Sequence, residues 1–276
     1  MKRWVLFLPF CAVIQFFCLS TLCDNFIFDI DGVLTRSNKL SFLWQAGPMR
    51  FVGLYNPFRL EHTMMRFLES IEPRRSETPL SFYHSNVLPQ IMCDWLCGLK
   101  TPQEIRALID HKFQTKNEFS GHKSFIKGIT SVIFNPELFI KGISPIKAGI
   151  KFFKKCAAVV DENGNRRHKM YILSNWDPES FLLLAHIPEL AELFELCEGI
   201  IISGEAKLMK PDIRIFEYLF SMYSIDPHNE LTIFIDDQKI NVAAARQLNK
   251  RKLHAFLCKN SEFKPIKKAL KKLGCF

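Results

Sequence analysis

Two carboxylates stand two residues apart at the end of a short apolar run near the N-terminus. Asp29 and Asp31 follow the run at residues 25–28, and Gly32 comes directly after them. An uninterrupted apolar run is typical of a strand buried on both faces, and a parallel sheet binds its ligands at the carboxyl ends of its strands. Because Gly32 allows the chain to turn away from the strand, both carboxylates can reach one cavity.

A second acidic pair ends another apolar run late in the chain. Asp236 and Asp237 follow residues 231–235. Ionised acids directly after a buried strand are costly unless they are paired or bind a metal. If the two strand ends meet in one sheet, three or four carboxylates gather there and require a cation. Their all-oxygen ligand set favours Mg²⁺, which predicts a metal site drawn from Asp29, Asp31, Asp236 and Asp237.

Two further segments supply groups that bind phosphate. The apolar run at residues 170–173 ends in Ser174 and Asn175, whose hydroxyl and neighbouring backbone N–H groups suit phosphate oxygens. Lys210 stands just before a predicted helix and can neutralise both a phosphoryl group and the acids. Singly, Ser174 could be a helix cap and Lys210 a surface lysine. Together with the acids, they supply in chain order the polar groups that phosphoryl transfer needs.

The apolar runs that end in these residues belong to a longer series. Five runs predict buried strands, at residues 25–28, 169–173, 199–202, 231–235 and 253–257. Four helical patterns lie before or between them, at residues 145–159, 178–185, 211–223 and 238–248. Strands that alternate with helices predict an α/β fold, a Rossmann-like parallel sheet with helices on both faces. The first strand is expected in the middle of the sheet.

The chain between the first and second strands breaks this alternation. Residues 37–141 contain few strand-like runs, and they predict helices at 60–71 and 87–96. A capping box at residues 101–104 begins a further helix. We therefore predict a mainly α-helical cap inserted after the first strand, over a core made of residues 24–36 and 142–276.

The first 23 residues form a separate hydrophobic leader. Lys2 and Arg3 precede an uncharged, mostly apolar run over residues 4–22, the pattern of a secretory signal peptide, although the run is also long enough to span a bilayer. A cleaved signal, a retained anchor and a segment packed on the fold all stay open. We expect a periplasmic or secreted protein if the leader is cleaved, and a membrane-anchored or cytoplasmic one otherwise.

The basic C-terminus is predicted to be a docked surface helix. The formal net charge is +9, and residues 263–273 carry Ile266, Leu270 and Leu273 at helical spacing with lysines between them. Membrane contact through this helix or through the leader is the alternative. Nucleic acid is not expected as a partner, because aromatic residues do not alternate with these lysines.

The four chemical segments resemble the motifs of the haloacid-dehalogenase-like (HAD) hydrolase superfamily. They read FIFDIDGVLT at residues 26–35, YILSN at 171–175, KPD at 210–212 and IDD at 235–237. Residues 236–245 are similar to the subfamily of glucose-1-phosphatase-like and phosphoglycolate-phosphatase-like enzymes. The predicted cap stands where such enzymes carry a helical cap.

This resemblance implies a Mg²⁺-dependent phosphatase that acts on a small phosphorylated substrate. Asp29 would be the nucleophile that forms an aspartyl-phosphate, and Asp31 would act as the acid and then the base. The phosphoryl group would be held by Ser174, Asn175 and Lys210. The metal ligands would be the carboxylates of Asp29 and Asp236 and the backbone carbonyl of Asp31. Asp237 would support this metal site.

Two other functions stay open on the same fold. A phosphomutase would share the aspartyl-phosphate but would need a cap residue to shuttle protons, and His84, Lys100 and His111 lie in the insertion. A non-catalytic exported binding protein is the alternative from another class. The sequence does not indicate the substrate, the oligomeric state or, if the protein is exported, which of its cysteines pair in disulfides.

Overall fold

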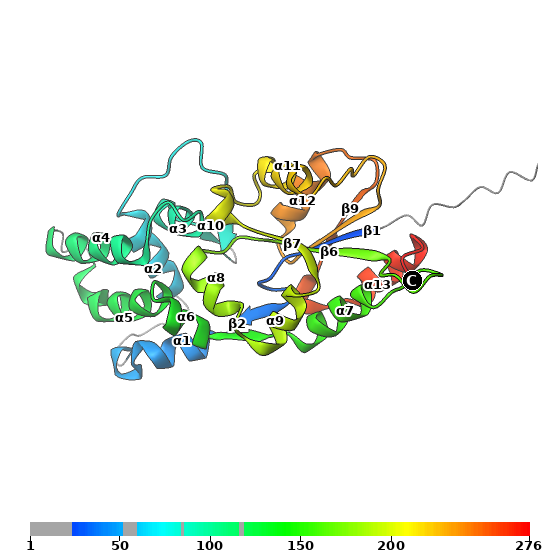
Figure 1. The fold of residues 1–276 in the computed structure, drawn as a ribbon. Coiled ribbons are helices and arrows are strands. Elements are labelled where there is room, and N and C mark those ends of the chain that lie inside the picture. Colours follow the sequence, from blue (N-terminus) through cyan, green and yellow to red (C-terminus); the bar gives the residue numbers. More distant parts are fainter. Residues whose placement is uncertain (1–23, 52–59, 84–85, 116–118) are drawn as a thin grey trace, which may run out of the picture.

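A computed structural model describes residues 24–51, 60–83, 86–115 and 119–276 of the chain. Figure 1 shows a sheet with helices packed on it on the right and a group of helices on the left. The predicted leader lies outside the described residues. None of the described helices combines the length and the apolar character needed to cross a membrane.

Five parallel strands form the central sheet in the order β7-β6-β1-β8-β9. They are β1 (Asp24–Phe28), β6 (His168–Ser174), β7 (Cys197–Ile202), β8 (Thr232–Asp236) and β9 (Leu253–Leu257). The central strand β1 pairs with β6 on one side and β8 on the other, which confirms its predicted place. The carboxyl ends of β1, β6 and β8 therefore meet at one edge of the sheet.

Helices cover both faces of the sheet, as predicted (Figure 1). Phe26 and Phe28 of β1 pack into the face covered by α7 (Lys147–Ala157), α9 (Pro188–Phe194) and α13 (Lys264–Lys272). Ile27 points to the opposite face, under α11 (Ile213–Met222) and α12 (Lys239–Gln247). A strand buried on both faces explains why residues 25–28 carry no alternation of apolar and polar residues.

The helix predicted at residues 211–223 begins two residues later than expected. Asp212 caps it by accepting a hydrogen bond from the Arg214 backbone N–H (2.9 Å), and the peptide bond between Lys210 and Pro211 is cis. Pro211 is therefore outside the helix. Ile213, at the first position of the helix, is 43% exposed, whereas Ile215 is fully buried.

The chain between β2 (Thr35–Ser37) and β5 (Ile143–Pro145) is mainly helical, in agreement with the predicted cap. Its helices are α1 (Lys39–Ala46), α2 (Leu60–Glu69), α3 (Gln90–Leu96), α4 (Pro102–Thr115), α5 (Lys123–Ile133) and α6 (Pro136–Lys141), with short 3-10 turns at Pro48–Phe51 and Ser120–His122. The capping box before α4 is formed: the Thr101 N–H donates to Glu104 Oε2 (2.7 Å), and the Glu104 N–H donates to Thr101 Oγ1 (3.2 Å). The helix expected from residue 87 begins only at Gln90, because Asn86–Val87 forms strand β4, which pairs with β3 (Phe82–Tyr83).

The cap and the core are in contact at several places, and hydrogen bonds link them at the following two. The antiparallel strands β2 (Thr35–Ser37) and β5 (Ile143–Pro145), which the sequence did not predict, pair where the chain leaves and re-enters the core. At the second place, Ser203 at the start of α10 (Ser203–Ala206) donates a hydrogen bond to the Leu96 carbonyl at the end of α3 (2.6 Å). These contacts hold the cap over the carboxyl edge of the sheet. The division at residues 37 and 141 stays a prediction.

The C-terminal helix α13 is docked on the core, as predicted. Ile266 and Leu270 are buried, and the ring of Phe263 lies 4.9 Å from that of Phe152 on α7. The lysines of α13 lie between these apolar positions. The six cysteines in the described part of the chain are all free: Cys93, Cys97, Cys156, Cys197, Cys258 and Cys275.

Candidate active site

A tight loop places the first acidic pair at the carboxyl edge of the sheet. The Asp29 N–H donates to the Ile235 carbonyl (2.9 Å), which extends the pairing of β1 with β8 by one residue. The Thr35 N–H then donates to the Ile30 carbonyl (2.8 Å) and closes the turn that carries Asp31. The chain therefore turns back immediately after its nucleophile candidate, as expected from the glycine at position 32.

Gly32 is required in this loop for two reasons. Its φ is +76°, a conformation that side chains rarely adopt. A Cβ atom built on it would lie 2.2 Å from Oδ2 of Asp237. The missing side chain thus lets the loop after β1 approach the acid that follows β8.

The Asp29 carboxylate is the centre of the site. It is 5% exposed, and its Oδ1 accepts hydrogen bonds from the Ile30 N–H, from Ser174 Oγ and from Lys210 Nζ, each at 2.8 Å. Burial raises the pKa of Asp29 to about 8; Lys210 opposes this shift, and the nearby carboxylate of Asp236 adds to it. The predicted nucleophile is therefore in direct contact with two of the three predicted phosphate-binding side chains, those of Ser174 and Lys210.

Lys210 is a fully buried cation held between two acids. Its Nζ donates to Asp29 Oδ1 (2.8 Å), to Asp236 Oδ2 (2.7 Å) and to the Leu173 carbonyl (2.8 Å). Burial acts to lower the pKa of Lys210, but Asp236 and Asp29 outweigh it, and the pKa is raised. The lysine is thus an ammonium ion at neutral pH and not the surface lysine of the simpler interpretation.

Asn175 positions Lys210. Its Nδ2 donates to the Lys210 carbonyl (2.9 Å), and the Lys210 N–H donates to Asn175 Oδ1 (2.8 Å). The side-chain amide is therefore committed to the lysine backbone. Its predicted part in phosphate binding stays a prediction, and the structure gives this side chain a role that its position beside Ser174 did not suggest.

Three of the four predicted metal ligands come together. Among the described residues, Asp29, Asp236 and Asp237 each offer a carboxylate oxygen within 4.8 Å of the others. Asp31 is not in this group: its side chain is half-buried, and its Oδ1 has no hydrogen-bond partner in the described part of the chain. Burial raises the pKa of Asp31 to about 7, and the charge of Asp29 adds to this shift.

The donor set fits a divalent cation such as Mg²⁺. Burial raises the pKa of Asp237 to about 7, with the charges of Asp236 and Asp31 adding to it. Lys210 supplies one positive charge to a cluster of four carboxyl groups. The remaining excess of negative charge and the hard oxygen donors both suit Mg²⁺.

Sequence reasoning missed several residues around this cluster. Asn241, in the first turn of α12, donates to both carboxylate oxygens of Asp236 (3.0 and 3.1 Å), and the Gln238 N–H donates to Asp236 Oδ1 (2.8 Å). Their position directly after the acidic pair, at the start of a predicted helix, was the available signal. Asp177, which also lines the cavity beside the site, carried no signal beyond that of a helix cap.

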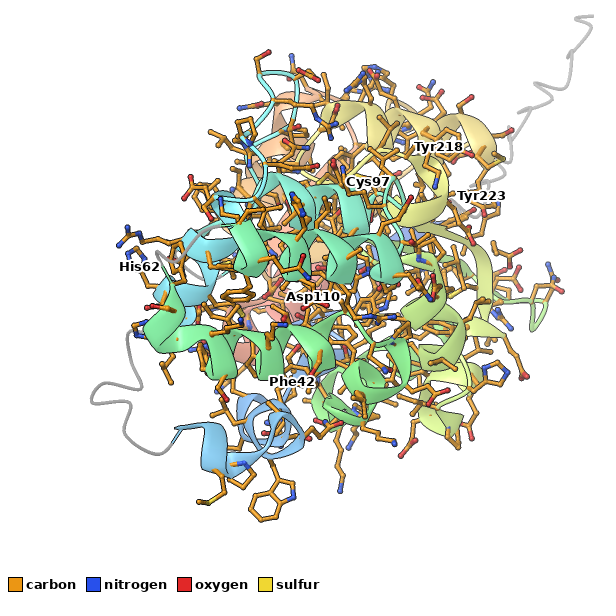
Figure 2. All side chains as sticks on the ribbon, turned by 90° about the vertical axis from the view of Figure 1, so that its left-hand side faces the viewer. Phe42, His62, Cys97, Asp110, Tyr218 and Tyr223 are labelled. Atoms are coloured by element: carbon orange, nitrogen blue, oxygen red, sulfur yellow. The ribbon has the colours of Figure 1, made fainter. Side chains whose placement is uncertain are left out.

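A cavity of about 490 Å³ opens above the site, between the core and the cap. Five of the seven predicted site residues line it: Asp29, Asp31, Ser174, Asn175 and Lys210. Asp236 is fully buried and Asp237 is half-buried, and neither is among the lining residues. Figure 2, viewed from the side of the cap, shows α4 and α5 across the front of the molecule. The arrangement is a buried carboxylate in contact with an ammonium ion and a hydroxyl at the floor of a covered chamber.

Comparison with known proteins agrees with this class of capped α/β hydrolase. The sequence profile of the haloacid dehalogenase-like hydrolase family matches residues 23–249. The chain therefore belongs to the HAD-like hydrolase family. A search of curated protein sequences found no match.

Solved structures of HAD enzymes share the fold at low sequence identity. A HAD family enzyme from Bacteroides thetaiotaomicron is 18% identical with a TM-score of 0.57, and the match covers 89% of this chain and 98% of that one. A predicted HAD-like family hydrolase from Porphyromonas gingivalis is 19% identical with a TM-score of 0.55, covering 91% of this chain and 98% of that one. The predicted family and fold class are confirmed, whereas the predicted subfamily stays a prediction.

Proposed function

We propose that this protein is a Mg²⁺-dependent phosphatase that hydrolyses a phosphate monoester through an aspartyl-phosphate on Asp29. One observation carries the proposal: the Asp29 carboxylate lines the floor of the cavity and accepts hydrogen bonds from both Ser174 and Lys210. A nucleophile, a hydroxyl donor and a fixed cation in contact at a cavity floor are what phosphoryl transfer from an ester requires.

In the first step, an oxygen of the Asp29 carboxylate attacks phosphorus. The bond between phosphorus and the leaving oxygen breaks, and Asp31 gives its proton to that oxygen, so the alcohol departs neutral. Ser174 and Lys210 donate hydrogen bonds to the phosphoryl oxygens while charge develops on them. The raised pKa of Asp31 supports a carboxyl group that carries a proton near neutral pH.

In the second step, water hydrolyses the aspartyl-phosphate. Asp31, now ionised, takes a proton from the attacking water, whose oxygen bonds to phosphorus while the bond to Asp29 breaks. Inorganic phosphate leaves, and both acids return to their starting states. The cap covers the chamber and limits the access of bulk water to the intermediate.

Asp29, Asp236 and Asp237 would hold the Mg²⁺ ion. Bound there, the ion would neutralise phosphoryl charge and offset the repulsion among the acids. The fold neighbour from Bacteroides thetaiotaomicron has been solved as a complex with magnesium and inorganic phosphate, at 19% identity and a TM-score of 0.54, covering 87% of this chain and 96% of that one. That complex is compatible with the proposal.

The phosphomutase alternative has less support. Lys100 forms ion pairs with Asp94 (2.9 Å) and Glu72 (3.1 Å), and neither Lys100 nor His111 is among the described residues that line the cavity. His84 lies outside the described residues. Neither Lys100 nor His111 is therefore indicated as a proton shuttle.

We also propose that the protein is exported after cleavage of its leader. The proposal depends on the basic start and the apolar run of residues 1–23. Expression of the full chain in a bacterial host, followed by mass measurement of the mature protein, tests it. A mature mass that still includes the leader would contradict cleavage.

Turnover of a generic aryl phosphate tests the phosphatase proposal. The full chain should hydrolyse 4-nitrophenyl phosphate with Mg²⁺, and EDTA should abolish the turnover. Asp29→Asn should lower kcat by at least about 10³-fold, because the amide cannot act as the nucleophile. Glu217→Gln is the matched control, since it makes the same change of acid to amide at an exposed position on α11.

Mass spectrometry separates the enzymatic from the non-catalytic function. Denaturation of the protein during turnover should trap a phosphate on Asp29, and the Asn variant should not acquire it. A folded wild-type protein that neither turns over any phosphate ester nor acquires phosphate would contradict the proposal and favour the non-catalytic binding protein.

A further inference from the structure

The cavity extends far beyond the catalytic floor. Its volume of about 490 Å³ lies in the range of roughly 300–1,000 Å³ that is usual for small-molecule sites. It reaches from Asp29 to residues of the cap helices α1, α2, α3, α5 and α6. One of these wall residues, Phe42 of α1, is labelled in Figure 2. The chamber therefore has a phosphate end in the core and a second end in the cap.

The cap end of the chamber is mostly apolar. The apolar wall residues that α2, α3 and α5 supply include Leu60, Met64, Met92, Trp95, Phe125 and Ile129. The two charged cap residues on the wall, Lys39 and Glu61, form an ion pair with each other at 2.8 Å. The described wall thus presents ring and aliphatic surface with its opposite charges paired.

Such a wall distinguishes between classes of phosphate ester. Beside its apolar residues, the wall offers few polar atoms to a hydroxylated ligand, among them those of Ser81, Trp95 and Trp176, which are unpaired within the described part of the chain. A sugar or glycerol phosphate would bring several hydroxyl groups against this wall, and each hydroxyl buried without a hydrogen bond lowers affinity by roughly tenfold. A ring-bearing apolar group would instead gain contact with an indole and with the adaptable methionine side chains. The wall therefore favours an apolar leaving group over a polyhydroxylated one.

Asp177 adds a polar feature to this wall. Its Oδ1 accepts a hydrogen bond from the Ser180 N–H (3.0 Å) and caps α8 (Pro178–Leu184). Its Oδ2 is buried and has no partner among the described residues, although the side chain is only 1% exposed and lines the cavity. Buried polar atoms are nearly always hydrogen-bonded, so an unpaired carboxylate oxygen here points to a donor supplied by a ligand.

We propose that the substrate is the phosphate monoester of a largely apolar, ring-bearing alcohol that donates a hydrogen bond to Asp177. This inference rests on the proposed phosphatase function and names its substrate class. Hydrolysis adds one water: the phosphorus–oxygen bond breaks, and the apolar alcohol and inorganic phosphate are released. Asp177 selects the substrate and takes no part in the bond changes.

A panel of alkyl phosphates tests the substrate class with the full chain and Mg²⁺. We compare 2-phenylethyl phosphate and its 3- and 4-hydroxyphenyl forms with glucose 6-phosphate and glycerol 3-phosphate. All have alkyl alcohols as leaving groups, so differences report binding of the organic part. The kcat/KM value of 2-phenylethyl phosphate should exceed that of glucose 6-phosphate by at least about 30-fold.

The better hydroxyphenyl substrate tests the role of Asp177. Wild-type protein should prefer it to 2-phenylethyl phosphate by about tenfold in kcat/KM, because only the former offers a donor. In Asp177→Asn this ratio should fall towards one, since the amide keeps the shape and can keep the cap but loses the accepting oxygen. Asp161→Asn, at a turn acid outside the cavity, should keep the wild-type ratio.

A wall substitution tests the apolar character directly. Met64→Gln should lower the preference for 2-phenylethyl phosphate over glucose 6-phosphate by about tenfold. Met222→Gln makes the same change at a position that is 53% exposed on α11, and it should leave the preference unchanged. Equal preferences in wild-type and Met64→Gln protein would contradict an apolar binding wall.

Acetyl phosphate separates failure of this inference from failure of the proposed function. If it is hydrolysed while the sugar and glycerol phosphates match or exceed the phenylethyl esters, the substrate class is wrong and the phosphatase stands. If neither acetyl phosphate nor any ester is hydrolysed, the phosphatase is wrong. Calorimetry then tests whether the chamber binds an apolar, ring-bearing group without turnover. The protein should bind 3-phenylpropylphosphonate at least about tenfold more tightly than methylphosphonate, and equal affinities would overturn the inference.

Discussion

The side-chain amide of Asn175 and the backbone of Lys210 are joined by two hydrogen bonds, one in each direction, at 2.9 and 2.8 Å. This pairing ties the end of β6 to the loop before α11, 35 residues later in the chain. It fixes the backbone of a lysine whose ammonium group lies between Asp29 and Asp236. The orientation of this buried cation therefore depends on a neutral side chain.

Asn175→Ala should impair catalysis more than substrate binding. Removal of the amide leaves the N–H and carbonyl of Lys210 without these partners and should lower the free energy of unfolding by about 1–3 kcal/mol. We expect kcat to fall by about 10- to 100-fold with a smaller change in KM, because Lys210 is displaced. Steady-state kinetics and urea unfolding measure both effects. Asn163→Ala, at an exposed turn, should change neither.

Gly32→Ala should lower the stability of the protein by more than a positive φ alone explains. An alanine at φ +76° is strained, and its Cβ would lie 2.2 Å from Asp237 Oδ2, so the acid must move. Gly164→Ala is the matched control, because Gly164 has φ +81° and no heavy atom lies within 4 Å of its added Cβ. We expect about 1 kcal/mol of lost stability at position 164, and about 2–4 kcal/mol with loss of turnover at position 32.

Equal losses of stability in the two variants would show that the contact with Asp237 does not constrain the loop. Thermal and denaturant unfolding of both variants provide this comparison. Turnover by Gly164→Ala should match that of the wild type, since Gly164 lies in the turn before β6, at the opposite end of that strand from Ser174.

Asp237→Asn should weaken Mg²⁺ binding. Asp237 offers one of three carboxylate oxygens that lie within 4.8 Å of one another, and its loss removes a negative charge from the cluster. We expect a decrease in Mg²⁺ affinity of about 10- to 100-fold by calorimetry. The rise in melting temperature on adding Mg²⁺ should shrink in parallel, which provides a readout besides turnover. An unchanged affinity would remove Asp237 from the metal site.

The ionisation of Asp177 should make stability depend on pH between about 4 and 6. Burial raises the pKa of Asp177 from 3.8 to about 6. In this window the carboxyl group is ionised in the unfolded chain but protonated in the folded one, so the folded state binds more protons. The contribution of the Asp177 carboxyl group to the free energy of unfolding is therefore full below pH 3.8 and is lost as the pH rises to about 6, which is its pKa in the folded protein.

Comparison of Asp177→Asn with the wild type isolates this contribution. The free energy of unfolding of the variant minus that of the wild type should rise by up to about 3 kcal/mol between pH 4 and 6 and stay level above it. Urea unfolding over this pH range measures the difference. A difference that does not vary with pH would show that Asp177 has an ordinary pKa in the folded protein.

The core of the fold could be predicted because local pattern and topology agree there. The five apolar runs became the five strands, since strands buried on both faces need uninterrupted apolar residues. Element boundaries were less accurate. The start of α11 moved to Ile213 because Asp212 forms the cap, which leaves Pro211 outside the helix. The strands β2 and β5 are three residues each and were missed because pairing at a distance leaves almost no trace in such short segments.

By itself, the sequence determined which groups could carry chemistry and that they would meet. Asp29, Ser174 and Asp236 each end an apolar run, and a parallel sheet brings the carboxyl ends of its strands to one edge. Only the tertiary structure decided what these groups and their neighbours touch. The amide of Asn175 binds the backbone of Lys210, and Asp177 leaves one oxygen unpaired on the wall of an apolar chamber. The physical reason is that strand patterns depend on local burial, whereas these contacts and the cavity depend on how distant segments of cap and core pack together.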